Sequence, residues 1–110
     1  MRKSKINISG FKIGTAENRE GLTGVTVILA PDGGATAGVD VRGCAPGTRE
    51  TDLLDPRKTV QKIHAVVLSG GSVFGLEAAS GCVKYLAEQG VGFPIGNVCV
   101  PIVCLSLIHI

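Results

Sequence analysis

The residues of this sequence best suited to chemistry are Gly70, Gly71 and Ser72, which stand between an apolar run and a helical pattern. Two glycines allow a sharp turn and the close approach of a ligand, and a helix start offers unpaired N–H donors. Such a turn favours a carboxylate, a phosphate or a developing oxyanion. It matches no phosphate-loop or nucleophile-elbow motif. The pattern alone favours a plain strand-to-helix turn with Ser72 as N-cap; the functional hypothesis is that these three residues bind substrate as one wall of a site.

A serine nucleophile needs a base, and His64 is the one histidine outside the last residues of the chain. It stands within the apolar run that precedes Gly70, where a lone histidine is typical of a packed core or edge position rather than of a general base. We therefore expect no catalytic dyad of Ser72 and His64.

A dense charged loop is the second candidate. It is suited to binding a substrate amine or carboxylate, but its charges can equally pair with one another and with backbone amides. Its members are Arg49, Glu50, Asp52 and Asp55.

Composition excludes several classes of function. The net charge of +2 is too small, and the cations too scattered, to indicate a nucleic-acid or membrane partner. The cysteines Cys44, Cys82, Cys99 and Cys104 form no Cys-x-x-Cys pair, which predicts free thiols in the cytoplasm, no metal and no cofactor. No apolar segment follows the basic N-terminus directly, so no secretory signal is expected.

The hydrophobic pattern predicts an α/β (α+β) chain. We expect a half-buried strand over 6–14 with a kink at Gly10, then a loop over 15–21. We expect a β-hairpin over 24–42, with a strand at 25–30, a turn at 31–34 and a returning strand at 35–42.

The second half predicts a loop, a short helix, a strand and a longer helix. Asp55 and Pro56 should open a helix that runs to about Lys62, and residues 63–69 should form a covered strand. Apolar spacing predicts a helix over 73–89, with Gly90 as its left-handed cap. Residues 89–110 carry no charge, but glycines and prolines argue for a strand at 98–104 rather than a membrane span.

Long runs in the sequence resemble the P1 family of DmpA-like, self-processing L-aminopeptidases/D-esterases (peptidase family S58), over about residues 6–103. The nylon-oligomer hydrolases and β-aminopeptidases look like relatives of this group. The matching runs are Gly24–Leu29, Ala37–Gly43, Ala45–Leu54, His64–Ser72 and Phe74–Ala79.

The resemblance implies the N-terminal part of a four-layer αββα fold, like that of the N-terminal-nucleophile hydrolases. Family members cut themselves once, and the new N-terminal Ser or Thr becomes the nucleophile. The implied substrates are small peptides, amides or esters, and the full-length family members are expected to form homo-oligomers. The nucleophile lies downstream of this chain, so the fragment itself is expected to be inactive.

The last residues depart from the family pattern. Residues 104–110 resemble a translated sequencing adapter, so we expect a domain over 1–103 followed by a non-native tail. The alternative function is a small anion-binding or structural module that uses the helix N-terminus at Gly70–Ser72.

Overall fold

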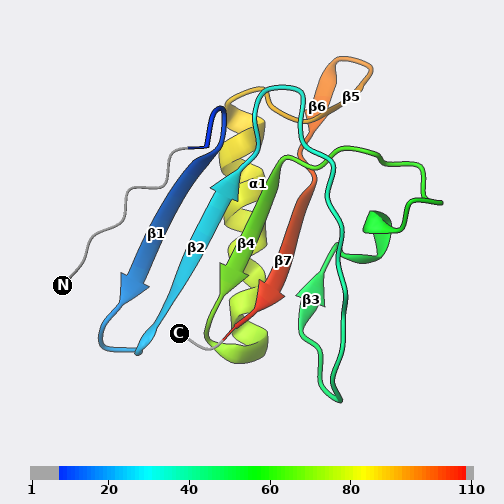
Figure 1. Cartoon of the computed structure of the whole chain (residues 1–110). Coiled ribbons are helices and arrows are strands. Elements are labelled where there is room, and N and C mark those ends of the chain that lie inside the picture. The colour runs from blue at the N-terminus through cyan, green and yellow to red at the C-terminus, as the bar shows by residue number, and fades with distance from the viewer. Residues whose placement is uncertain (1–7, 109–110) are drawn as a thin grey trace.

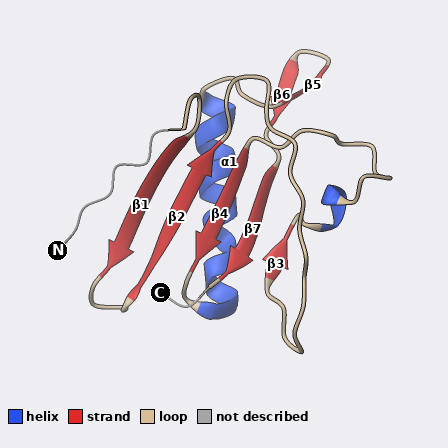
Figure 2. Cartoon of the chain, viewed as in Figure 1, coloured by secondary structure: helices blue, strands red, loops and turns tan. Residues whose placement is uncertain are grey.

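A mixed five-stranded sheet with one helix against it forms the body of the computed structural model, which describes residues 8–108 (Figures 1 and 2). The sheet has the order β1-β2-β4-β7-β3, and β5 pairs with β6 in a separate hairpin. This arrangement confirms the predicted α+β class. The strands are β1 Lys12–Asn18, β2 Thr23–Leu29, β3 Thr48–Arg49, β4 Ala65–Ser69, β5 Phe93–Ile95, β6 Val98–Val100 and β7 Val103–Leu107. The helical segments are the 3₁₀ turns η1 Asp52–Leu54 and η2 Ser72–Glu77, and the α-helix α1 Ala78–Glu88.

The centre of the sheet is a parallel pair, β4 and β7, whose register sets Ala65 beside Val103 and Ser69 beside Leu107. Parallel strands need a long crossover, and here it consists of η2, α1 and the β5–β6 hairpin. The remaining strand pairs, β1–β2, β2–β4 and β3–β7, are antiparallel. The crossover places α1 against the middle of the sheet.

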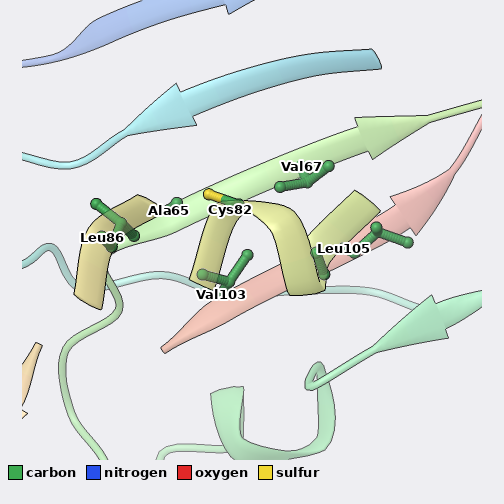
Figure 3. Packing of buried hydrophobic residues seen from close by; sticks show 7 residues of the cluster. Ala65, Val67, Cys82, Leu86, Val103 and Leu105 are labelled. Atoms are coloured by element: carbon green, nitrogen blue, oxygen red, sulfur yellow. The ribbon is translucent and has the colours of Figure 1, made fainter. Parts of the chain in front are cut away.

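The core lies between α1 and the two central strands, as Figure 3 shows. Alternation along β4 turns Ala65 and Val67 toward the helix, while Val66 and Leu68 face away from it. Each buried aliphatic side chain contributes about 1.5–3 kcal/mol. The cluster consists of Ala65, Val67, Ala79, Cys82, Leu86, Val103 and Leu105.

The opposite face of the sheet, toward the viewer in Figure 1, has neither a helix nor a second sheet over it within residues 8–108. We call it the open face. The cross-strand register and the alternation of side chains assign it Ile13, Ile28, Val66 and Leu68, flanked by Thr15 and Thr26. Ile13 is 46% exposed.

The predicted hairpin over 24–42 is wrong, although its turn is real. The N–H of Gly34 donates to the carbonyl of Pro31 at 3.0 Å, and Gly33 and Gly34 both have positive φ. The returning chain, however, makes only a single bridge, from Ala35 to Ile63, and forms no strand over 36–42. The physical reason is that β1 and β4 already occupy both edges of β2.

The other boundaries also shift. Residues 6 and 7 of the strand predicted over 6–14 lie outside the described residues; Gly10 does turn the chain, with φ 84°, but the strand follows it and takes up most of the expected loop. No helix forms over 56–62: the N–H of Arg57 donates to the Asp55 carboxylate, and the chain continues as turns. A segment of charged and polar residues with only Val60 to bury gains too little from packing to remain helical.

The helix predicted over 73–89 is present, but its first turns are the 3₁₀ segment η2. Gly90, with φ 70°, ends it as predicted, and the N–H of Val91 returns to the carbonyl of Leu86. The strand expected at 98–104 is two strands, β6 and β7, and β7 extends to Leu107. The prediction that residues 104–110 are non-native is not tested by this arrangement.

Among residues 8–108, no helix is long and apolar enough to cross a membrane.

Candidate functional site

The turn of Gly70, Gly71 and Ser72 lies at the carboxyl end of β4, beside the start of β2. The N–H of Gly70 donates to the carbonyl of Gly24 at 3.0 Å, which holds the turn to the sheet. Gly71 has φ 87°, and Ser72 follows with φ 57°, a left-handed conformation that non-glycine residues adopt rarely. Backbone strain of this kind costs about 1–3 kcal/mol and concentrates at functional sites.

Gly75 locks the turn from the helix side. A Cβ placed there would collide with the carbonyl oxygen of Gly70 and come within 2.8 Å of the Ser69 hydroxyl. That hydroxyl is buried and donates to the same Gly70 carbonyl at 3.2 Å. The turn therefore keeps its shape because the helical segment presses directly on its backbone.

A cavity of about 400 Å³ opens beside the turn, and Gly70, Gly71 and Phe74 line it. On its other side it is lined by the end of β1 and the start of β2, including Thr23. The Thr23 hydroxyl is buried and has no hydrogen-bond partner among residues 8–108. Phe74 is 87% exposed. The cavity is largely apolar, with one unsatisfied hydroxyl in its wall.

The helix start differs from the sequence expectation in a way that bears on anion binding. The N-cap position of η2 is held by Gly71 rather than by Ser72, and no side chain caps it. The segment that follows is a six-residue 3₁₀ helix rather than an α-helix. The α-helical first turn that the anion-binding alternative assumes is therefore absent at Gly70–Ser72, although η2 continues directly into α1.

His64 lies at the other end of β4 from Ser72. The five residues of β4, which span roughly 16 Å at the rise of an extended strand, lie between them together with Gly70 and Gly71. The His64 ring is 6% exposed, and its Nδ1 accepts a hydrogen bond from the N–H of Ile102 at 3.0 Å. Burial lowers the pKa of His64. His64 is therefore a structural residue, and no Ser72–His64 dyad forms.

The charged loop does not act as one unit. Asp55 pairs with Arg57 at 2.7 Å, and the Arg57 side-chain and backbone hydrogen bonds lower the pKa of Asp55. Asp52 and Asp55 line a cavity of about 1010 Å³ between residues 36–41 and 51–63. Arg49 points elsewhere, toward the helix.

Arg49 is the functional candidate whose setting the sequence does not reveal. Its Nη1 donates to the Ser80 hydroxyl at 2.6 Å and to the Leu76 carbonyl at 3.3 Å. These bonds tie the edge strand β3 to the junction of η2 and α1. The apolar spacing of the helix places Ser80 outside the core stripe, but only the pairing of Arg49 with Leu105 assigns Arg49 to the helix face.

Comparison with known proteins identifies relatives over most of the chain. The model of peptidase family S58 matches residues 5–106. An uncharacterized aminopeptidase of Mycobacterium tuberculosis (strain ATCC 25618 / H37Rv) is 52% identical over 80 residues, which are 73% of this chain and 23% of that protein. An uncharacterized aminopeptidase of Mycobacterium leprae (strain TN) is also 52% identical over 80 residues, 73% of this chain and 22% of that protein.

A second group of relatives carries a more specific name. A 6-aminohexanoate-oligomer endohydrolase of Paenarthrobacter ureafaciens is 39% identical over 85 residues, 77% of this chain and 21% of that protein. The chain thus spans less than a quarter of the length of these relatives. The family match covers nearly the whole chain, and the described fold contains the mixed sheet and helix expected of a part of such a protein. The chain belongs to peptidase family S58.

Proposed function

We propose that this chain is the N-terminal part of a precursor of an S58 hydrolase, which removes N-terminal residues from peptides, amides or esters after cutting itself once. The match of the family over residues 5–106 carries the proposal. The names of the relatives, aminopeptidase and oligomer endohydrolase, support amide bonds as the target. The chain alone is expected to be inactive because the nucleophile belongs to the part that follows.

The open face supports the view that the chain is one part of a larger fold. Ile13, Ile28, Val66 and Leu68 form an apolar sheet surface of the kind that a second sheet covers in a sandwich. Relatives more than four times as long as the matched segment have ample sequence for that sheet. We assign the open face to contact with the second half of the enzyme.

Gly70, Gly71 and Ser72 are proposed as one wall of the substrate site. The strained φ of Ser72, the adjacent cavity and the unsatisfied Thr23 hydroxyl all support this role. The chemistry itself is assigned to the missing part, with no cofactor. We also propose that the enzyme works in the cytoplasm as a homo-oligomer; the four free cysteines are in keeping with a reducing compartment.

A chimera tests the proposal. This chain would replace the matching N-terminal segment of the endohydrolase of Paenarthrobacter ureafaciens, and the product would be followed on denaturing gels and with amino-acid p-nitroanilides. We expect self-cleavage into two fragments and hydrolysis above background, and no turnover by the chain alone. Turnover by the chain alone that a Ser72→Ala change abolishes would overturn the assignment of the nucleophile to the second half.

A further inference from the structure

Arg49 is separated from the acidic residues that surround it in sequence. It pairs with Leu105, whose side chain faces α1, so the Arg49 side chain emerges on the helix side of the sheet. Glu50 is next to Cys104 instead: the Cys104 thiol donates to the Glu50 carbonyl at 3.2 Å, and burial and the Glu50 charge raise the pKa of that thiol to about 11. Strand alternation thus separates the Arg49 cation from the acidic residues that are next to it in the sequence.

The guanidinium of Arg49 has donors to spare. Both of its hydrogen bonds, to Leu76 and Ser80, leave from Nη1, and among the bonds found within residues 8–108 none uses Nη2 or Nε. No carboxylate of these residues lies within ion-pair distance of it. A partly buried arginine usually has an anionic partner, because a charge that loses water needs compensation.

These spare donors adjoin a cavity of about 570 Å³ on the outer side of η2. Its lining combines apolar side chains with one cation, that of Arg49, and one carboxylate, that of the exposed Glu77. Phe74 lines this cavity and also the one beside Gly70 and Gly71. The lining residues are Arg49, Val73, Phe74, Leu76, Glu77 and Ser80.

We propose that Arg49 binds a carboxylate in this cavity. A guanidinium offers two parallel N–H donors at the spacing of the two oxygens of a carboxylate, and Nη1 is already fixed by Ser80. The Glu77 carboxylate in the same lining repels further negative charge, which favours a singly charged anion over a phosphate dianion. The apolar wall of Val73, Phe74 and Leu76 suits a ligand with an aliphatic body.

The claim that this carboxylate belongs to a substrate rests on the proposed function. The claim that Arg49 binds a carboxylate does not. A short peptide or amino-acid oligomer that lies across η2 would place its carboxylate on Arg49 and its chain toward the turn at Gly70 and Gly71. The site then prefers substrates with a free carboxylate over the corresponding amides.

Binding is measured by titrating the whole chain, labelled with ¹⁵N, with N-acetyl-leucine and separately with N-acetyl-leucinamide. The two probes differ only in the carboxylate. We expect N-acetyl-leucine alone to shift the Arg49 Nε–H signal and the amides of Val73–Glu77, with saturation in the millimolar range. Arg49→Lys should weaken this binding roughly tenfold, because an ammonium cannot form the paired bonds. Glu77→Gln should strengthen it about two- to fivefold.

Arg57→Lys is the matched control, since Arg57 is a largely exposed arginine paired with Asp55 and distant from this cavity; it should leave binding unchanged. Equal shifts with both probes, no shift at tens of millimolar, or an unaltered titration in Arg49→Lys would overturn the proposal. If Arg49→Lys does not fold, the probe comparison and Glu77→Gln still decide, because neither removes the bonds of Arg49 to α1. Failure of the chimera with retained binding would reject only the enzymatic assignment.

Discussion

At the scale of single residues, the two ends of β4 serve different purposes. His64 at the amino end bonds to the chain that leads into β7, both through its ring and through its backbone N–H, which donates to the Ile102 carbonyl at 2.8 Å. Ser72, beyond the carboxyl end, has a left-handed backbone conformation that non-glycine residues adopt rarely. His64 therefore links β4 to the segment that leads into β7, and Ser72 lies at the proposed wall of the substrate site.

The stability of the chain should fall on mild acidification because of His64. Its pKa is lowered by burial, so the folded state binds fewer protons than the unfolded state below the ordinary value of 6.5. The stability is therefore complete above about pH 6.5 and declines as the pH falls toward the folded pKa, by at most about 1.4 kcal/mol per pH unit.

Urea unfolding followed by circular dichroism between pH 7.5 and 5.5 checks this, with His109 replaced by Gln so that His64 is the one imidazole left. His64→Asn retains an acceptor for the Ile102 N–H but cannot titrate, and its stability should be flat over this range. An equal slope in the two proteins would contradict the assignment.

The Thr23 hydroxyl should be dispensable for folding, because it is buried without a partner. Thr23→Val keeps the shape and removes the cost of an unsatisfied hydroxyl, so we expect the free energy of unfolding to rise by about 1 kcal/mol. In the active chimera the same change should raise the KM, since the hydroxyl is placed in the substrate wall. Thr59→Val, in the exposed turns that follow Asp55, is the control and should change neither quantity by more than about 0.5 kcal/mol or its equivalent.

At the scale of elements, the two glycines of the η2–α1 segment make a matched pair. A Cβ at Gly75 collides with the Gly70 carbonyl, whereas a Cβ at Gly81 meets nothing within 4 Å. Gly75→Ala should therefore destabilise the chain by about 1–3 kcal/mol, and Gly81→Ala should stabilise it by about 1 kcal/mol through helix propensity. Thermal or urea unfolding measures both, and the same sign for the two changes would show that the contact with Gly70 is not the reason for Gly75.

The elements that the sequence predicts well are those with a strong local signal. The strand around Val25–Leu29, the strand within 63–69 and the helix that Gly90 ends all appear, because apolar period and cap residues are encoded locally. Gly70, Gly71 and Ser72 are likewise recognisable as a turn from their types alone.

The elements that fail depend on distant partners. Residues 39–41 alternate as a strand should, but β1 and β4 fill both edges of β2, and nothing local reports that competition. The contact of Arg49 with Ser80 is equally invisible, since it joins residues on separate elements across the crossover. The hydrophobic pattern of the sequence thus predicts individual strands and helices. Which strands pair, and which side chains meet, is seen only in the folded structure.

At the scale of the whole molecule, α1 covers one face of the sheet, and the other face has neither a helix nor a second sheet over it within residues 8–108. Val66 and Val67 are neighbours on β4 with opposite surroundings: Val67 is 0% exposed in the core, and Val66 lies on the open face. Val66→Lys should be tolerated, with a cost of about 1 kcal/mol or less, and should reduce dye binding and self-association.

Val67→Lys should prevent folding, because the core offers an ammonium no partner. Circular dichroism, dye fluorescence and sedimentation compare the two variants. A loss of fold in Val66→Lys would show that the open face is already covered within this chain. In the chimera, by contrast, Val66→Lys should block assembly with the second half.

The position of β7 has a consequence for how the protein is made. Among the strands of the described chain it is the last to leave the ribosome, yet it occupies the place between β4 and β3. Until it emerges, the main sheet can contain only β1, β2 and β4, with β4 lacking its parallel neighbour and β3 lacking the partner that it has among the described residues. Folding is therefore held back to the end of this segment, and in that interval the unpaired edge of β4 is the surface that chaperones or other nascent chains would meet first.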